Sequence, residues 1–414
     1  MPGFLRVVDL EAVRTELERL WTPSPRICEV PLSSAYGRIV VGDVVSPIDL
    51  PPFDRAAYDG YAVVASDTFG ADEENVRRLF LVGEIAPGAP PKLRIRRGTC
   101  ARISTGAALP GGADAVLMSE HAEEQKGEVV VRRAVAPGEN VTRRGSDIRR
   151  GETLVRDGTV LTPAHIGAIA AAGVGKVRVR KKPRVAIIST GDELIPQGRR
   201  LSPGRIYDSN GPALVSAVME CGGDPVYMGI TRDNARAIRS KVVRAFRSCD
   251  IVLISGGTSA GRGDLVPEII GGMRGAKILA HGLAQKPGKP ALVALVGKKL
   301  VFGLPGYPTS SLMVFDLLVG DQIRRLSGMS RSERHTVRAF LAQKVISAPG
   351  RREFLPVRLR KENKKLVAHP VLKDSGAIAS LSSSDGYIEI PAETEIVREG
   401  EEVEVRLLRG LPNA

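Results

Sequence analysis

Between Pro183 and Leu326 the sequence alternates between two kinds of segment. Short, continuously apolar stretches such as PRVAIIST, DIVLISGG and LVFGLPG predict buried strands, and amphipathic stretches such as ARAIRSKVVRAF predict helices between them. Strands that are apolar on both faces need cover on both faces, which alternating helices provide in a doubly wound parallel sheet. We therefore expect an αβ domain here, ending in a helix from Thr309 to Leu326.

The regions on either side of this domain have a different pattern. From Val30 to Arg180, short β-branched runs interrupted by Gly and Pro predict a β-rich region with hairpins. One helix breaks the pattern, with Thr162 as its expected N-cap, Pro163 as its first residue and Gly173 at its end. Residues 336–414 carry only short alternating runs, such as EFLPVRLR and EEVEVRLL, which predict a small all-β barrel or sandwich.

The N-terminal segment predicts a helix rather than a targeting signal. Residues 9–20 have apolar side chains at helical spacing and Asp9 as a plausible N-cap, but no apolar centre typical of a signal peptide. The uncharged run from Leu300 to Phe315 is too short, and too interrupted by proline, to span a bilayer. The four scattered cysteines include no C-x-x-C pair, which argues against a zinc ribbon or a disulfide framework. We expect a soluble, cytoplasmic protein without a membrane partner.

The charge of the chain predicts an anionic ligand or a highly solvated surface. Sixty Lys and Arg against 46 Asp and Glu give a net charge of +14, which attracts nucleic acid, membrane surfaces or phosphorylated small molecules. We expect no nucleic-acid partner. The nine Phe, seven Tyr and one Trp leave few platforms for base stacking, and no helix-turn-helix or zinc-finger pattern is present.

Ligands of open parallel sheets bind beyond the carboxyl ends of the strands, and four sequence clusters fall there. In the first, residues 189–193 (STGDE), hydroxyls and carboxylates face the crevice, or Asp192 simply caps an ordinary loop. In the second, residues 255–264 (SGGTSAGRGD), four glycines allow backbone amides to approach a phosphate, although a flexible linker loop is the alternative. This loop lacks the Gly-Lys-Ser/Thr of a P-loop and the G-x-G-x-x-G of a dinucleotide site.

The other clusters are cationic, rigid or acidic. Prolines hold Lys286 and Lys289 on a stiff turn, KPGKP, which favours an anion clamp. The turn from Gly303 to Pro308 is suited to wall a pocket. In the β-rich region, residues 51–63 (PPFDRAAYDGYAV) place two acids beside a Gly-Tyr turn, where they either bind a metal, position a ligand or form local Asx turns.

Eight segments, taken together and in order, resemble a known family. They are PPFDRAAYDGYAV, RISTGAALPGGADAV, NVTRRGSDI, STGDEL, YDSNGPAL, GGTSAGRGD, KPGKP and GLPGYPTSS, and they span residues 51–311. This combination is similar to the molybdopterin molybdenumtransferases, the MoeA family, which includes the E domain of gephyrin. Any one segment is a weak signal, whereas eight in the same order are highly specific.

The resemblance implies a multidomain architecture, α/β plus β-rich. Residues 1–50 and 148–180 would form an elongated N-terminal domain, and residues 51–147 a β-rich second domain. Residues 181–328 would form the central doubly wound αβ domain of molybdopterin-binding type, and residues 333–414 a small C-terminal β-barrel. The resemblance also implies a homodimer, in which the second domain of one chain completes the active site of its partner.

The implied reaction takes adenylylated molybdopterin and molybdate (or tungstate), cleaves the adenylate with the help of Mg²⁺, and yields molybdenum cofactor and AMP. A molybdopterin adenylyltransferase would be the upstream donor. The implied catalytic residues are Asp59, Thr105, Asp147, Glu193, Asp233 and Asp264, of which Glu193, Asp233 and Asp264 would organise the metal. The implied substrate-binding residues are Ser189, Thr190, Gly191, Ser255, Gly256, Gly257, Thr258, Ser259, Gly261, Lys286, Lys289, Pro305 and Pro308.

The chain departs from the family pattern at three places. Arg55-Ala56 stands where the family often has Asn-Ser or Arg-Ser, Gln285 replaces a usual aliphatic residue, and Tyr307 stands where many members have Asn. Two other functions remain open at this point. One is nucleotidyl transfer of the molybdopterin adenylyltransferase type, which usually needs a single αβ domain, and the other is a non-enzymatic scaffold.

Overall fold

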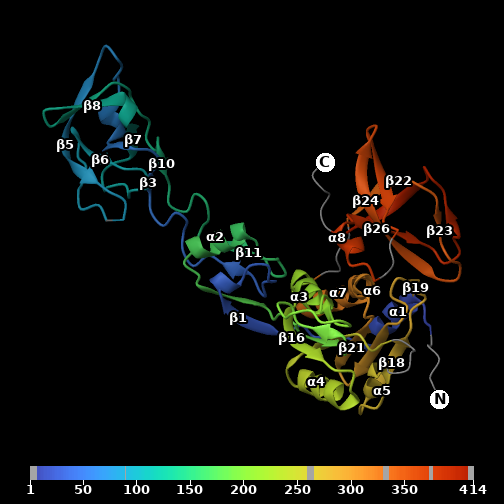
Figure 1. Cartoon of the computed structure of the whole chain (residues 1–414). Helices are drawn as coiled ribbons and strands as arrows, with labels where there is room; N and C mark the ends of the chain where they lie inside the picture. Colours follow the sequence, from blue (N-terminus) through green and yellow to red (C-terminus); the bar gives the residue numbers. More distant parts are fainter. Residues whose placement is uncertain (1–6, 89, 259–264, 330–334, 373–375, 409–414) are drawn as a thin grey trace. The chain divides into compact units, whose positions relative to one another are not determined.

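The computed structural model describes residues 7–88, 90–258, 265–329, 335–372 and 376–408. The chain forms two compact units, one of residues 1–27 and 180–414 and the other of residues 28–179 (Figure 1). The first unit contains the αβ domain and the C-terminal β domain, and the second contains the β-rich region. Within the described ranges, no helix is long and apolar enough to cross a membrane.

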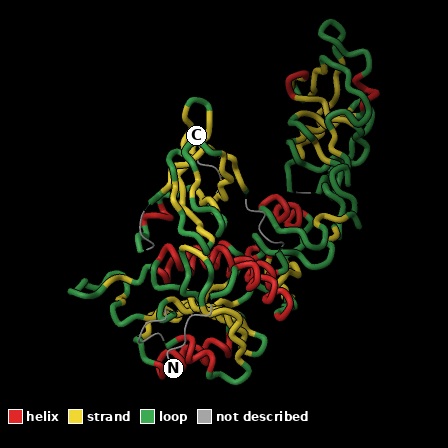
Figure 2. Tube along the Cα trace, turned by 90° about the vertical axis from the view of Figure 1, so that its right-hand side faces the viewer, coloured by secondary structure: helices red, strands yellow, loops and turns green. Residues whose placement is uncertain are grey.

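A six-stranded sheet forms the centre of the αβ domain, with helices on both of its faces (Figure 2). In spatial order the strands are β16 (Asp224–Thr231), β13 (Arg184–Thr190), β17 (Ile251–Ser255), β21 (Lys299–Leu304), β20 (Leu292–Val296) and β18 (Ala276–His281). The first four are parallel, whereas β20 is antiparallel to both of its neighbours. A tight turn at Gly297, with a φ of 62°, joins β20 to β21 and leaves no room for a crossover helix. The sheet is therefore mixed at one edge, which its apolar sequence did not reveal.

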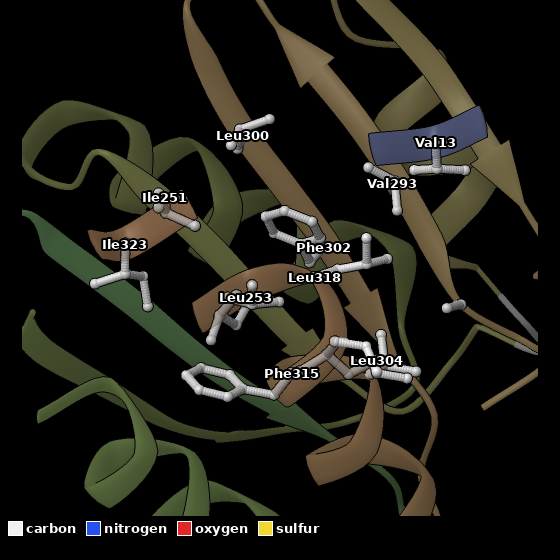
Figure 3. Packing of buried hydrophobic residues seen from close by; sticks show 14 of the residues in the cluster. Val13, Ile251, Leu253, Val293, Leu300, Phe302, Leu304, Phe315, Leu318 and Ile323 are labelled. Atoms are coloured by element: carbon white, nitrogen blue, oxygen red, sulfur yellow. The ribbon is translucent and has the colours of Figure 1, made fainter. Parts of the chain in front are cut away.

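The helices of this domain pack on the sheet in two layers. They are α3 (Asn210–Glu220), α4 (Ala235–Ser248), α5 (Val266–Gly271), α6 (Pro308–Val314) and α7 (Gly320–Ser327), with a π-helical turn at Phe315–Val319 between the last two. Side chains of alternate residues of β17 pack against opposite helical layers. Leu253 packs in one cluster with Phe302 and Leu318, as Figure 3 shows, and Val252 packs in the other with Val242 of α4. Both faces of the central strands β13, β17 and β21 are thus buried, as their continuous apolar sequences predicted.

The first helix, α1 (Leu10–Leu20), belongs to the unit that contains the αβ domain. Asp9 caps it as predicted, because its Oδ1 accepts a hydrogen bond from the amide of Glu11 (2.8 Å). Val13 and Leu17 on its apolar face are buried in the same cluster as Val293 of β20 (Figure 3). Helix α1 thus packs within the unit that contains residues 180–414.

The C-terminal domain is a closed five-stranded barrel. Its strands are β24 (Arg352–Glu362), β25 (Lys365–Pro370), β22 (Thr336–Leu341), β28 (Glu402–Leu407) and β26 (Gly386–Ile390), and β26 pairs back with β24 to close the ring. The short strands β23 (Val345–Ile346) and β27 (Ile396–Val397) pair beside it, and α8 (Ala379–Ser382) precedes β26. One strand from the αβ domain, β19 (Gln285–Lys286), pairs with β24 in parallel. This pairing joins the predicted lysine clamp to the barrel.

The second unit contains the predicted β-rich region. Its largest sheet has the order β7 (Ala115–Met118), β4 (Gly60–Val63), β6 (Thr99–Ile103), β5 (Arg77–Ile85), β9 (Glu128–Val131) and β8 (Ala122–Gln125). Smaller pairs join β3 (Arg55–Ala56) to β10 (Val141–Thr142), β2 (Val44–Val45) to β11 (Thr153–Val155), and β1 (Ile27–Pro31) to β12 (Lys176–Arg180). Short 3₁₀ turns occur at Leu32–Ser34, Ala65–Thr68 and Ser119–His121.

Two predictions made from local sequence are confirmed in this unit and across the chain. Helix α2 (Pro163–Ala171) has Thr162 as its N-cap in a capping box, and Gly173 follows it with a φ of 79°. All four cysteines are free. Burial raises the pKa of Cys100 to about 12 and that of Cys221 to about 11, so both thiols stay protonated and unreactive at neutral pH.

Candidate active site

The loops after β13 and β17 meet at the carboxyl edge of the parallel strands. In the observed register Ser189 of β13 lies beside Ser255 of β17, and Ser255 lies beside Leu304 of β21. Gly256 then has a φ of 98°, and a Cβ at this position would lie 2.3 Å from the Thr190 carbonyl oxygen. Only glycine allows this approach. The Gly256 amide donates to the Leu304 carbonyl (3.0 Å), so the phosphate cradle predicted for this loop cannot use it.

A cavity of about 1580 Å³ opens at this edge, and residues of both the αβ domain and the barrel line it. The predicted site residues that line it are Thr190, Glu193, Asp233, Ser255, Gly256, Gly257, Thr258, Lys286, Lys289, Pro305 and Pro308. Ser189 is fully buried behind this lining, and a Cβ at Gly191 would lie 2.7 Å from the Glu193 carboxylate. The predicted residues Ser259, Gly261 and Asp264 lie outside the described residues.

Two carboxylates on this lining are candidates for holding a divalent cation. Glu193 and Asp233 are both exposed, and the hydroxyl of Thr190 donates to Asp233 Oδ1 (2.5 Å). Among the residues that the structure describes, no three His, Cys, Asp or Glu side chains form a group that could hold a metal ion. Two carboxylates nevertheless fit Mg²⁺, which usually binds one or two of them together with phosphate oxygens and water.

Asp208 organises the floor of the cavity, and sequence reasoning did not single it out. Its side chain is buried, with 1% of the residue exposed. Oδ2 accepts hydrogen bonds from Ser189 Oγ (2.7 Å) and the Tyr227 hydroxyl (2.5 Å), and Oδ1 accepts one from the Gly211 amide (2.9 Å). Three donors offset the cost of burying a carboxylate, so Asp208 fixes β13, β16 and the start of α3 relative to one another.

The same network engages the other hydroxyls of the edge. Asn210 Nδ2 donates to Ser255 Oγ (2.7 Å) and to the Gly306 carbonyl (2.8 Å). Burial and the hydrogen bond to Asp208 raise the pKa of Tyr227 to about 12, so this phenol remains a donor throughout the physiological range. Ser189 and Ser255, predicted to contact substrate, thus already have partners within the protein.

The barrel supplies a carboxylate that the sequence did not indicate. Lys286 Nζ lies 2.7 Å from Oε1 of Glu353 on β24, and Ser347 Oγ donates to Oε2 of the same residue (2.7 Å). Glu353 is 5% exposed, whereas about half of the Lys286 side chain is exposed to the cavity. Arg351, beside Glu353, also lines the cavity. Only the pairing of β19 with β24 brings these distant residues together.

The predicted site residues of the second unit are all exposed. The Thr105 amide donates to Asp59 Oδ1 (2.7 Å), so these two residues lie together at the end of β6. Asp147 is placed by a different contact, in which its amide donates to the Leu50 carbonyl (3.1 Å). Asp54 has a local role, because the Arg144 amide and the Arg143 guanidinium donate to it and hold its pKa below the usual range. Of the two acids in this motif, Asp59 therefore remains the candidate for function.

The three departures from the family pattern occupy different environments. Ala56 is buried and pairs with Val141 of β10. Gln285 is 1% exposed, and its Nε2 donates to the Pro287 carbonyl (3.1 Å), which braces the lysine turn. Tyr307 is 64% exposed and lines the cavity. Only the last of these substitutions presents a large side chain to a ligand.

Comparison with known proteins identifies the family. The chain matches the MoeA N-terminal region (domain I and II) over residues 8–173, a probable molybdopterin binding domain over residues 186–325, and the MoeA C-terminal region (domain IV) over residues 338–408. It belongs to the molybdopterin molybdenumtransferase family, MoeA. The resemblance seen in the sequence and the predicted fold class are thereby confirmed.

Individual MoeA relatives cover nearly the whole chain. Molybdopterin molybdenumtransferase 2 of Mycobacterium tuberculosis is 33% identical over 400 residues, which are 94% of this chain and 98% of the relative. A molybdopterin molybdenumtransferase of Bacillus subtilis is 32% identical over 92% of this chain and 89% of its own. The crystal structure of a molybdopterin biosynthesis MoeA protein from Pyrococcus horikosii has a TM-score of 0.78 and 43% identity, and covers 98% of this chain and 100% of its own.

Because Lys286 pairs with Glu353, we expect an anionic ligand to compete with the Glu353 carboxylate for the Lys286 ammonium group. Replacing the acid in Glu353→Gln removes a negative charge from the cavity while keeping the size of the side chain. We expect the Kd for inorganic pyrophosphate, measured by titration calorimetry at low salt, to fall about 2- to 10-fold. Glu389→Gln is the matched control, because Glu389 pairs with Arg352 and Arg406 and does not line the cavity. Unchanged or weaker binding in Glu353→Gln contradicts the competition.

Proposed function

We propose that the protein inserts molybdate, or tungstate, into adenylylated molybdopterin and releases AMP, as a step of molybdenum cofactor biosynthesis. One observation carries the proposal. In a chain of the MoeA family, a single cavity at the carboxyl edge of the αβ sheet combines the cations Lys286, Lys289 and Arg351 with the acids Glu193 and Asp233. A substrate that carries phosphates and takes up a metal oxyanion needs both kinds of group.

The cations account for substrate binding. Lys286 and Lys289 are exposed on the KPGKP turn, and Gly288 between them has a φ of 104°. A Cβ at Gly288 would lie 2.5 Å from Val314, so the turn packs closely on α6 and holds both ammonium groups at the cavity. They would neutralise the phosphates of the adenylate as point charges, and binding should weaken as salt rises.

The acids account for the requirement for a divalent cation. Carboxylates beside a phosphorylated substrate repel it unless a cation lies between them. Glu193 and Asp233 would hold Mg²⁺ there, with Thr190 keeping the Asp233 carboxylate in place through its 2.5 Å hydrogen bond. When bound, Mg²⁺ would neutralise phosphate oxygens and so favour loss of AMP. Molybdate is a substrate in this scheme, and Asp264 is proposed to help organise it.

We further propose that the protein acts as a cytoplasmic homodimer with a composite site. Asp59, Thr105 and Asp147 would complete the cavity of the partner chain, and a molybdopterin adenylyltransferase would supply the adenylate. The exposed position of Asp59, where it already orients the Thr105 amide, supports a role toward a group outside its own domain.

The first test measures whether AMP release depends on metal insertion. The purified protein should release AMP from adenylylated molybdopterin only when both Mg²⁺ and molybdate or tungstate are present. Asp233→Asn should lower the rate about 100-fold or more, because it removes a proposed ligand of the cation. Asp224→Asn is the matched control, since Asp224 begins β16, which ends two residues before Asp233, and lies outside the lining. Release of AMP at full rate in EDTA, or a product that contains no molybdenum or tungsten, would contradict the insertion reaction.

The second test addresses the composite site by subunit mixing. Homodimers of Asp59→Ala and of Asp233→Ala should each be inactive. After re-equilibration about half of the dimers are mixed, and each mixed dimer contains one doubly damaged site and one intact site. About a quarter of wild-type activity should therefore return. If subunit exchange is verified with a tag and no activity returns, each site is built from a single chain.

A further inference from the structure

The lining of the cavity includes exposed apolar side chains as well as cations. Tyr307, Leu372 and Ile378 all line it, and they are 64%, 62% and 47% exposed. Large apolar side chains that stay exposed together around a cavity usually mark a surface that a ligand covers. The cavity thus offers cations to phosphates and apolar side chains to an uncharged, apolar part of the same ligand.

The neighbouring prolines and a segment near the barrel position Tyr307 at the cavity. Tyr307 precedes α6 with extended backbone angles, φ −69° and ψ 127°, and lies between Pro305 and Pro308. The barrel-side segment that follows residue 375 packs beside it. A Cβ at Gly376 would lie 3.7 Å from ring atoms Cδ1 and Cε1, and Thr309 Oγ1 donates to the Ala377 carbonyl (3.0 Å). The Tyr307 ring therefore lies next to Gly376, and most of its surface remains exposed.

We propose that Tyr307 is a stacking platform for a planar bicyclic heterocycle of the substrate, while Lys286 and Lys289 hold its phosphates. The inference rests on the proposed function, whose substrate carries two such rings, a purine and a pterin. A tyrosine ring has only two side-chain torsions, so it loses little conformational entropy when a flat ring covers it. Stacking of this kind is sensitive to the aromatic face and insensitive to the phenol hydroxyl.

The experiment compares three probes by titration calorimetry on the full-length protein. AMP and a pterin phosphate each carry one of the two ring systems, and ribose 5-phosphate carries a phosphate without a ring. The variants are Tyr307→Ala, which removes the platform, and Tyr307→Phe, which keeps the aromatic face. Tyr36→Ala is the matched control, because Tyr36 is 66% exposed but belongs to the other unit.

In Tyr307→Ala we expect the Kd of AMP or of the pterin phosphate to rise about 5- to 150-fold, and the affected probe identifies the ring that stacks. Ribose 5-phosphate should bind within about twofold of wild type, and Tyr307→Phe and Tyr36→Ala should bind all three probes normally. The stacking proposal is contradicted if neither AMP nor the pterin phosphate binds the wild-type protein, or if neither binds more weakly to Tyr307→Ala. It is also contradicted if all three probes bind equally more weakly to Tyr307→Ala, or if Tyr307→Phe is as defective as Tyr307→Ala.

These outcomes are separable from those of the proposed function. If probe binding depends on Tyr307 but the protein releases no AMP with Mg²⁺ and molybdate, metal insertion is contradicted and the stacking proposal stands. Metal-dependent AMP release combined with normal probe binding in Tyr307→Ala would contradict the platform alone.

Discussion

In the parallel register of β13, β17 and β21, the last residues of three strands lie side by side at one edge of the sheet. This register decides where polar groups can gather, because everything before the edge is buried between two helical layers. The loops that leave the edge are brought together by close backbone contact, as at Gly256 against the Thr190 carbonyl. The position of the cavity and of the loop acids beside it follows from this arrangement, whereas its cations come from β19 and the turn after it, and from the barrel.

The edge is stabilised by a buried carboxylate. Asp208 would be costly to bury without partners, and the three hydrogen bonds that it accepts hold three different elements in place. A second carboxylate, Glu353, links the barrel to the lysine turn in the same cavity. Both acids act on the protein rather than on the ligand. Among the described residues, the groups left for a ligand include the exposed acids Glu193 and Asp233, the cations Lys286, Lys289 and Arg351, and the exposed ring of Tyr307.

Much of this could be predicted from local sequence, since local sequence encodes periodicity, caps and turns. The apolar strands, the Asp9 and Thr162 caps and the clusters at the strand ends were all visible in this way. The sequence also showed that Tyr307 departs from the family pattern, but it did not show that the Tyr307 side chain is exposed. What the sequence could not reveal depends on pairing between distant segments.

Two such pairings, and one local turn, decided details of the fold and site. The local turn is the one at Gly297, which sets the direction of β20, because an apolar strand has the same composition in either direction. The place of α1 depends on which apolar surface its stripe meets. The contact of Lys286 with Glu353 depends on the addition of β19 to a barrel strand that follows much later in the chain. Periodicity contains no information on partners of this kind.

The most direct measurement of the central claim is a crystal structure of the full-length protein with AMP and tungstate bound. We expect the AMP phosphate to lie within hydrogen-bond distance of Lys286 or Lys289, at the carboxyl edge of β13, β17 and β21. We also expect tungsten density in the same cavity, near Glu193 and Asp233. AMP or tungstate bound away from this cavity, with the cavity itself filled only by water, would contradict it.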